Sequence, residues 1–142
     1  MISRRNIRVK VMQTLYTITT LEKDVKPAEQ QKILEQHFDQ TRSLFIYLIY
    51  FLTEVTGYAE TDAQHRAAKH LPTYEDLHVN TRISANELLR KMLNDSALKE
   101  QFSTLKPELI LDKELVKKIY HDLSETAEYK SYIMQPVIDK NE

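Results

Sequence analysis

The chain has 142 residues with one glycine, four prolines and no cysteine, which excludes a disulfide framework and a turn-rich β sandwich and favours helices in a single domain. Lys and Arg total 20 against 21 Asp and Glu, and the net charge of −1 predicts no general attraction to nucleic acid. The cations are unevenly placed, however, because residues 1–21 carry four of them and no acid.

The first predicted helix runs from an N-cap at Ser3 to about residue 21. Four apolar residues recur along it at steps of four, four and three and predict a buried stripe: Ile7, Val11, Leu15 and Ile18. Arg4 and Arg8 are expected on the same side as this stripe, beyond its N-terminal end, with Arg5 about 100° round the helix.

These three arginines are open to two interpretations. In the first, their stems lie on apolar surface and their charges pair with acids elsewhere in the domain. In the second, they bind an anion. A helix N-terminus already carries a partial positive charge, so cations in its first two turns are unfavourable unless an anionic ligand is present.

The segment from Arg4 to Tyr16, with the sequence RRNIRVKVMQTLY, resembles the opening helix of the NusB transcription antitermination family. That family's pattern is a run of arginines, a small or apolar turn, and then Gln-x-Leu-Tyr. Arg4, Arg5 and Arg8 stand at matching arginine positions, and Asn6 replaces an arginine that is common there. The closing motif is matched by Gln13, Leu15 and Tyr16.

The resemblance implies a non-catalytic transcription antitermination factor of the cytoplasm that needs no cofactor. Its opening helix would contact boxA-like, single-stranded RNA together with a NusE-like ribosomal protein. Arg4, Arg5 and Arg8 would hold phosphates, and Lys10 and Gln13 would be further RNA-binding residues. The competing hypothesis is a helical protein–protein interaction module without direct RNA binding.

Later segments resemble a longer-chain branch of the same family, which carries extra helices. They are the aromatic-rich long helix, residues 86–89 (NELL) and residues 128–132 (EYKSY). The C-terminal half that the family uses for most RNA and NusE contacts is not found in this sequence. We therefore expect the chain to be the N-terminal part of a longer protein, with the C-terminal NusB half as a partner in the same protein.

The second predicted helix begins at Pro27 and contains the nine-residue apolar run 44–52, which is too short to span a bilayer. Alternating steps of four and three define a helical seam through it: Leu34, Phe38, Thr41, Phe45, Leu48, Leu52 and Val55. We expect the middle of this helix to be buried on nearly all sides. Phe45 and Leu48 should then be core residues.

Gly57, the only glycine, permits two ends for this helix. It could be a C-cap, or it could lie inside a longer helix that continues through alanines at steps of four to Leu71 and stops at Pro72. The continuous helix is preferred.

The remaining residues predict shorter helices. After a loop over residues 72–83, a capping box from Ser84 to Glu87 starts a helix, and Asp112 caps another. The apolar residues expected inside are Leu88, Leu89, Met92, Leu93, Leu115, Val116, Ile119 and Leu123. A last helix spans about 125–134. The predicted fold is an all-α helical bundle around one long central helix, with a single domain over residues 1–136 and a frayed tail over 137–142.

No Gly-rich phosphate loop, nucleophile elbow or pair of metal ligands at helical spacing is found in the sequence, so we do not expect an enzyme. The nearest approach to a metal site is Glu60, Asp62, His65 and His70. Only Asp62 and His65 share a helix face, so an exposed polar face is favoured over a metal site.

Overall fold

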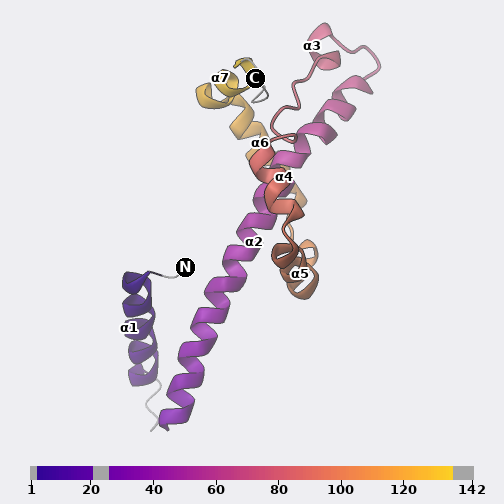
Figure 1. Ribbon diagram of the computed structural model, residues 1–142. Helices are drawn as coiled ribbons and strands as arrows, with labels where there is room; N and C mark the ends of the chain where they lie inside the picture. Colours follow the sequence, from indigo (N-terminus) through magenta and orange to yellow (C-terminus); the bar gives the residue numbers. More distant parts are fainter. Residues whose placement is uncertain (1–2, 21–25, 136–142) are drawn as a thin grey trace, which may run out of the picture. The chain divides into compact units, whose positions relative to one another are not determined.

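The computed structural model describes residues 3–20 and 26–135, and all regular structure in these ranges is helical (Figure 1). The elements are α1 (Arg4–Thr20), α2 (Pro27–Ala67), α3 (Tyr74–Leu77), α4 (Glu87–Asn94), α5 (Ser96–Leu105), the 3-10 helix η1 (Pro107–Leu109), α6 (Lys113–Glu125) and α7 (Ala127–Met134). The predicted all-α fold with one long central helix is confirmed. Among the described helices, none combines the length and apolar content needed to cross a membrane. The predicted tail lies outside the described residues.

The chain divides into two compact units, Met1–Ile46 and Tyr47–Glu142. The boundary falls inside α2, so one continuous helix belongs to both units. Such a helix is compatible with one domain or with two, and the single domain over residues 1–136 stays a prediction.

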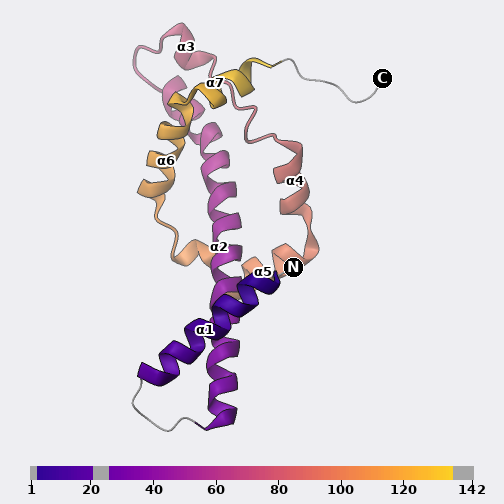
Figure 2. The same ribbon diagram turned by 90° about the vertical axis from the view of Figure 1, so that its left-hand side faces the viewer.

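In the first unit, α1 begins where the sequence predicts, because the Ser3 hydroxyl accepts a hydrogen bond from the Asn6 amide at 3.2 Å. Figure 2 shows α1 lying against the N-terminal part of α2. The side of α1 that meets α2 includes the buried Thr14, whose hydroxyl lies 2.9 Å from Nδ1 of His37. The predicted stripe is confirmed in part. Val11, Leu15 and Ile18 line a hollow between α1 and α2, so the stripe does face α2, but Ile7 and Leu15 remain exposed and the stripe is not buried.

The helix α2 passes through Gly57 without interruption, which confirms the continuous helix, and it ends at Ala67, four residues before the predicted end. The expected burial of its middle is wrong. Ile46 is buried, but Phe45 and Leu48 are 62% and 52% exposed. The spacing of apolar residues correctly marks one face of a helix, but it does not show whether another element covers that face.

In the second unit, the core consists of Val55, Ala59, Val116 and Tyr120. Tyr120 is 2% exposed, and its ring lies 5.3 Å from the ring of Tyr58 and 6.5 Å from that of Tyr129, measured between centroids. Burial raises the pKa of the Tyr120 hydroxyl well above its ordinary value, with a smaller contribution from Tyr129. The predicted inward face of α6 is right at Val116.

Other parts of the predicted interior are wrong, because several of its residues lie at the surface. The exposed ones are Leu88, Leu93, Leu115 and Ile119. The core residue Tyr120 is absent from the prediction. A tyrosine side chain can lie in a core or at a surface, so the position of Tyr120 on α6 did not predict its burial.

Helix caps in the second unit follow local sequence. The Asp112 carboxylate accepts from the amides of Glu114 and Leu115, as predicted. At α4 the capping box from Ser84 is wrong, because the side chain of Asn86 is the N-cap and accepts from the Leu88 amide at 2.9 Å. Asn86 was the stronger candidate on position, since it directly precedes the first helical residue.

Two side chains of the loop before α4 hold the C-terminal end of α7. Arg82 donates to the carbonyls of Tyr132 and Gln135, and its guanidinium lies 5.1 Å from the centroid of the Tyr132 ring. Asn80 donates to the Ile133 carbonyl at 3.1 Å. A cation at a helix C-terminus is electrostatically favourable, so this contact fixes the loop against α7.

Candidate nucleic-acid interface

Arg5 and Arg8 lie on the outer side of α1, and Arg4 lies at the edge of that side. At about 100° per residue, the nine residues from Arg5 to Thr14 amount to half a turn, which places Arg5 opposite the side of α1 that meets α2. Arg4 and Arg8 fall within about 100° of Arg5, and all three side chains are exposed. The structure therefore brings these three predicted residues together on one accessible surface, which we call the arginine face.

No acid neutralises the arginine face within the described part of the chain. The helix α1 contains no Asp or Glu, and the ion pairs of the described residues join side chains between positions 62 and 130. The three cations also stand at the end of α1 where the backbone amides already carry partial positive charge. Among the described residues, the charge of this surface is therefore uncompensated.

Lys10 is separated from the arginine face. It lies four residues before Thr14 on the same side of α1, is half-buried, and its carbonyl accepts the Thr14 hydroxyl hydrogen at 2.9 Å. Arg8 and Lys10 stand about 200° apart round the helix. Gln13 is exposed and lies about 80° from Arg5, so it flanks the arginine face.

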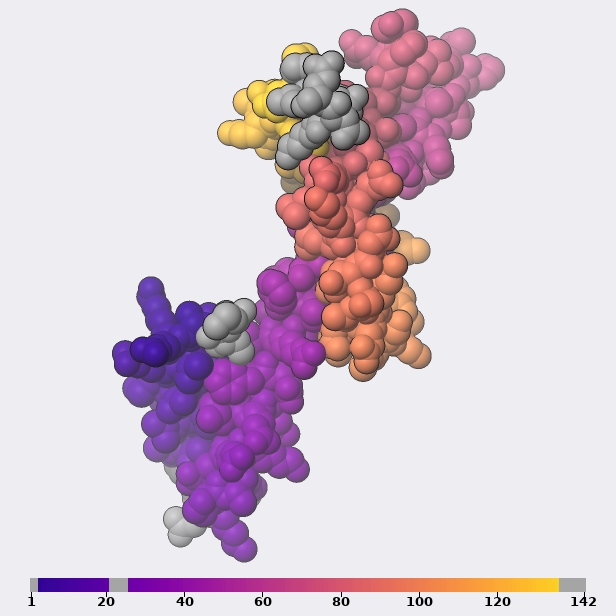
Figure 3. Space-filling model, in the orientation of Figure 1, coloured from indigo at the N-terminus to yellow at the C-terminus, as the bar shows by residue number. Residues whose placement is uncertain are grey.

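Large apolar side chains continue the outer side of α1 beyond the arginines. Met12 is 68% exposed and Tyr16 is 73% exposed. Figure 3 shows much of α1, in indigo, at the surface of the molecule. Cations and apolar groups thus occupy successive turns of the same exposed side.

The sequence did not predict the side-chain contact between Thr14 and His37. The single hydrogen of the Thr14 hydroxyl points to the Lys10 carbonyl, so His37 must contribute the hydrogen in the second contact, through Nδ1–H. A Thr four residues after Lys10 and a His in the following helix give no distinctive spacing. The pair lies between α1 and α2, on the side of α1 opposite Arg5.

The four residues considered as metal ligands, Glu60, Asp62, His65 and His70, do not have a common environment in the structure. Asp62 is buried and forms an ion pair with Arg66 at 2.8 Å, whereas His65 and His70 are exposed. Within residues 3–20 and 26–135, no three His, Asp or Glu side chains lie close enough together to hold a metal ion.

No family model, no curated protein and no solved structure matches this chain. The arginine face must therefore be interpreted from its own geometry and from the sequence pattern that carries it.

Proposed function

We propose that the chain is an RNA-binding, non-catalytic transcription antitermination factor of the NusB type, and that the arginine face holds RNA phosphates. The observation that carries this proposal is an exposed cluster of three arginines at a helix N-terminus, with no acid on the helix and no ion pair to the described residues. Arginine presents a planar set of donors that suits phosphate oxygens, and an anion there offsets the repulsion among the cations.

The RNA in this proposal is single-stranded and boxA-like, and a NusE-like ribosomal protein binds beside it. The resemblance of RRNIRVKVMQTLY to the NusB opening helix supports both partners. Phosphate contacts fix the register of the RNA, whereas bases are recognised by other groups. Gln13, beside the arginine face, is placed to reach the same ligand, but Lys10 faces the opposite side of α1 and is assigned no phosphate.

Replacing Arg4, Arg5 and Arg8 together by Ala tests the proposal. Three exposed cations near a helix N-terminus add no stability there, so the variant should remain folded. Its affinity for a boxA-like single-stranded RNA should fall strongly. The matched control replaces Lys99, Lys117 and Lys118, which are exposed cations of the second unit, and changes the net charge by the same amount.

The proposal requires that the arginine variant loses RNA binding while the lysine variant keeps it. Equal losses in the two variants would mean that RNA responds only to net charge. Unfolding of the arginine variant, seen as loss of helical circular dichroism, would show that the arginines are structural.

A second candidate function is a helical protein–protein interaction module without direct RNA binding. The exposed Met12 and Tyr16 favour it, because adjacent large apolar side chains in solvent mark interaction surfaces. If parent protein shows no RNA binding at low salt, while Met12→Ser with Tyr16→Ser abolishes capture of a protein partner, this second function takes the place of the first.

A further inference from the structure

Gly57 has no explanation within the fold of the second unit. It lies in the interior of α2, where glycine costs about 1 kcal/mol relative to alanine. Its φ is not positive, and a Cβ atom built on it would meet nothing within 4 Å. Neither backbone strain nor close packing within the described chain requires a glycine at this position. The space above Gly57 is open.

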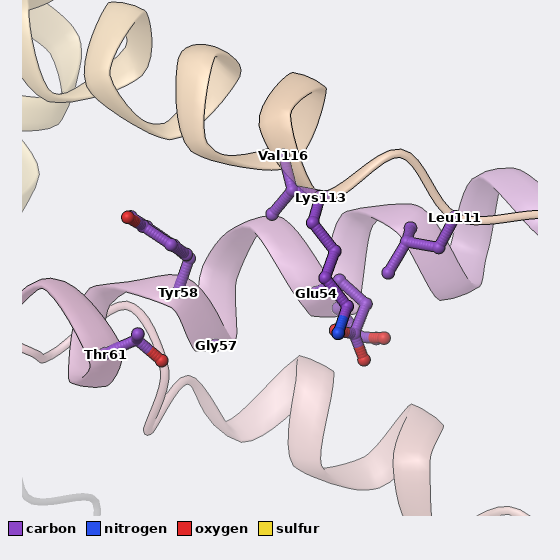
Figure 4. Close-up of a pocket in the computed structure, with 8 residues that line it drawn as sticks. Glu54, Gly57, Tyr58, Thr61, Leu111, Lys113 and Val116 are labelled. Atoms are coloured by element: carbon purple, nitrogen blue, oxygen red, sulfur yellow. The ribbon is translucent and has the colours of Figure 1, made fainter. Parts of the chain in front are cut away.

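That space is a hollow of about 420 Å³ between α2 and the start of α6 (Figure 4). Thr53, Gly57 and Thr61 lie on its α2 side, and Leu111 and Val116 form an apolar wall. Ligand sites in proteins usually enclose roughly 300–1,000 Å³ and combine apolar walls with a few polar groups. The hollow is large enough for a small molecule and presents both apolar and polar groups.

Opposite charges line this hollow. Glu54 stands on α2 and Lys113 reaches towards it from the first position of α6, as Figure 4 shows. The two do not form an ion pair with each other. Burial raises the pKa of Tyr50 to about 12, with a smaller contribution from the nearby Glu54 carboxylate. A carboxylate and an ammonium group that do not pair with each other therefore share one hollow.

We propose that the hollow binds a small dipolar molecule of the aliphatic α-amino acid class. Its ammonium group would lie against Glu54, its carboxylate against Lys113, and its side chain against Leu111 and Val116. The bare backbone at Gly57 leaves room for the ligand main chain, because an added methyl group would project into the hollow. This inference is independent of RNA binding, since all of these residues belong to the second unit.

The test titrates the 142-residue chain with L-leucine, L-valine and L-methionine and follows backbone amide shifts by NMR. We expect saturable binding with shifts at the amides around Gly57 and Lys113. The matched probe N-acetyl-L-leucinamide keeps the side chain but lacks both charges, and it should not bind. If none of the three amino acids binds saturably, or if the uncharged amide binds equally well, the proposal is overturned.

Two variants connect binding to the hollow. Gly57→Leu should fill it and abolish binding while the helix remains intact, because leucine is a better helix former than glycine. Lys113→Ala removes a charge-assisted hydrogen bond and should weaken binding about tenfold or more, whereas Lys117→Ala on the same helix should not. Unchanged affinity in Gly57→Leu, or equal effects of the two lysine variants, would place any binding elsewhere and contradict the proposal.

Discussion

The two compact units differ in what holds their helices together. Among the described residues of Met1–Ile46, only Thr14 and Ile46 are buried, and the side chains of Thr14 and His37 form a hydrogen bond between α1 and α2. The second unit instead has an aromatic and aliphatic core around Tyr120. Burial of apolar surface is the main stabilising term in folding, so the second unit should carry most of the stability.

The units also differ in charge. Residues 1–46 contain eight Lys and Arg against five Asp and Glu, whereas residues 47–142 contain twelve against sixteen. The weakly held unit is thus the basic one and carries the arginine face. Elements that bind ligands are commonly drawn from the less stable parts of a protein. The main stabilising core and the proposed RNA contact therefore lie in different units.

The largest expected effect is in the aromatic core. Tyr120→Ala should lower the free energy of unfolding by about 3 kcal/mol or more, because it empties the centre of the core. Phe45→Ala is the control and should cost less than about 1 kcal/mol, since its side chain is mostly in solvent. Urea unfolding followed by circular dichroism measures both. Similar losses would mean that the exposed run of α2 is covered in solution.

A smaller effect is expected in the first unit. Thr14→Val keeps the shape of the side chain but removes the hydroxyl that contacts His37, and it should cost about 1 kcal/mol. Hydrogen exchange at the amides of α1 should then accelerate. Thr19→Val is the control, because the Thr19 hydroxyl bonds only a carbonyl of its own helix. If both variants accelerate exchange equally, the contact with His37 does not hold α1.

Gly57→Ala should stabilise the second unit by about 0.5–1 kcal/mol, because alanine is the better helix former and its methyl group meets no atom. Thermal unfolding measures the change. Destabilisation would contradict the open hollow above Gly57, since it would show that something packs against this position.

The smallest effect concerns the turn before α3. Asp76 accepts hydrogen bonds from Lys69 at 2.7 Å and from the Thr73 amide at 3.1 Å, and these contacts lower its pKa from 3.8 to about 2. A lowered pKa in the folded state stabilises the turn above pH 3.8, and this contribution is lost as the pH falls towards 2. An NMR titration of the Asp76 carboxyl should show the low value in parent protein and a higher one in Lys69→Ala. Identical values would exclude the contact.

Local signals in the sequence correctly predicted the starts of α1, α2 and α6. Ser3, Asp112 and Pro27 act on neighbouring backbone groups, so their positions suffice to locate the starts of helices. Burial was predicted poorly, as Phe45 and Leu48 show, because periodicity defines a helix face but not the element that covers it.

The candidate site was also predictable only where its features depend on residues close together in the sequence. The cluster of Arg4, Arg5 and Arg8 was predictable, since these residues lie within two turns of one helix. The separation of Lys10 from Arg8 follows from the same helical spacing. The contact between Thr14 and His37 was not predictable, because the two residues lie 23 positions apart on different helices.

The central claim is that the arginine face binds RNA phosphates, and the salt dependence of RNA affinity tests it most directly. On single-stranded RNA, three phosphate contacts predict a slope of about −2 for the logarithm of the affinity against the logarithm of the salt concentration. The slope should approach zero when Arg4, Arg5 and Arg8 are all replaced by Ala. A parent slope near zero, or the same slope in both proteins, would contradict the account.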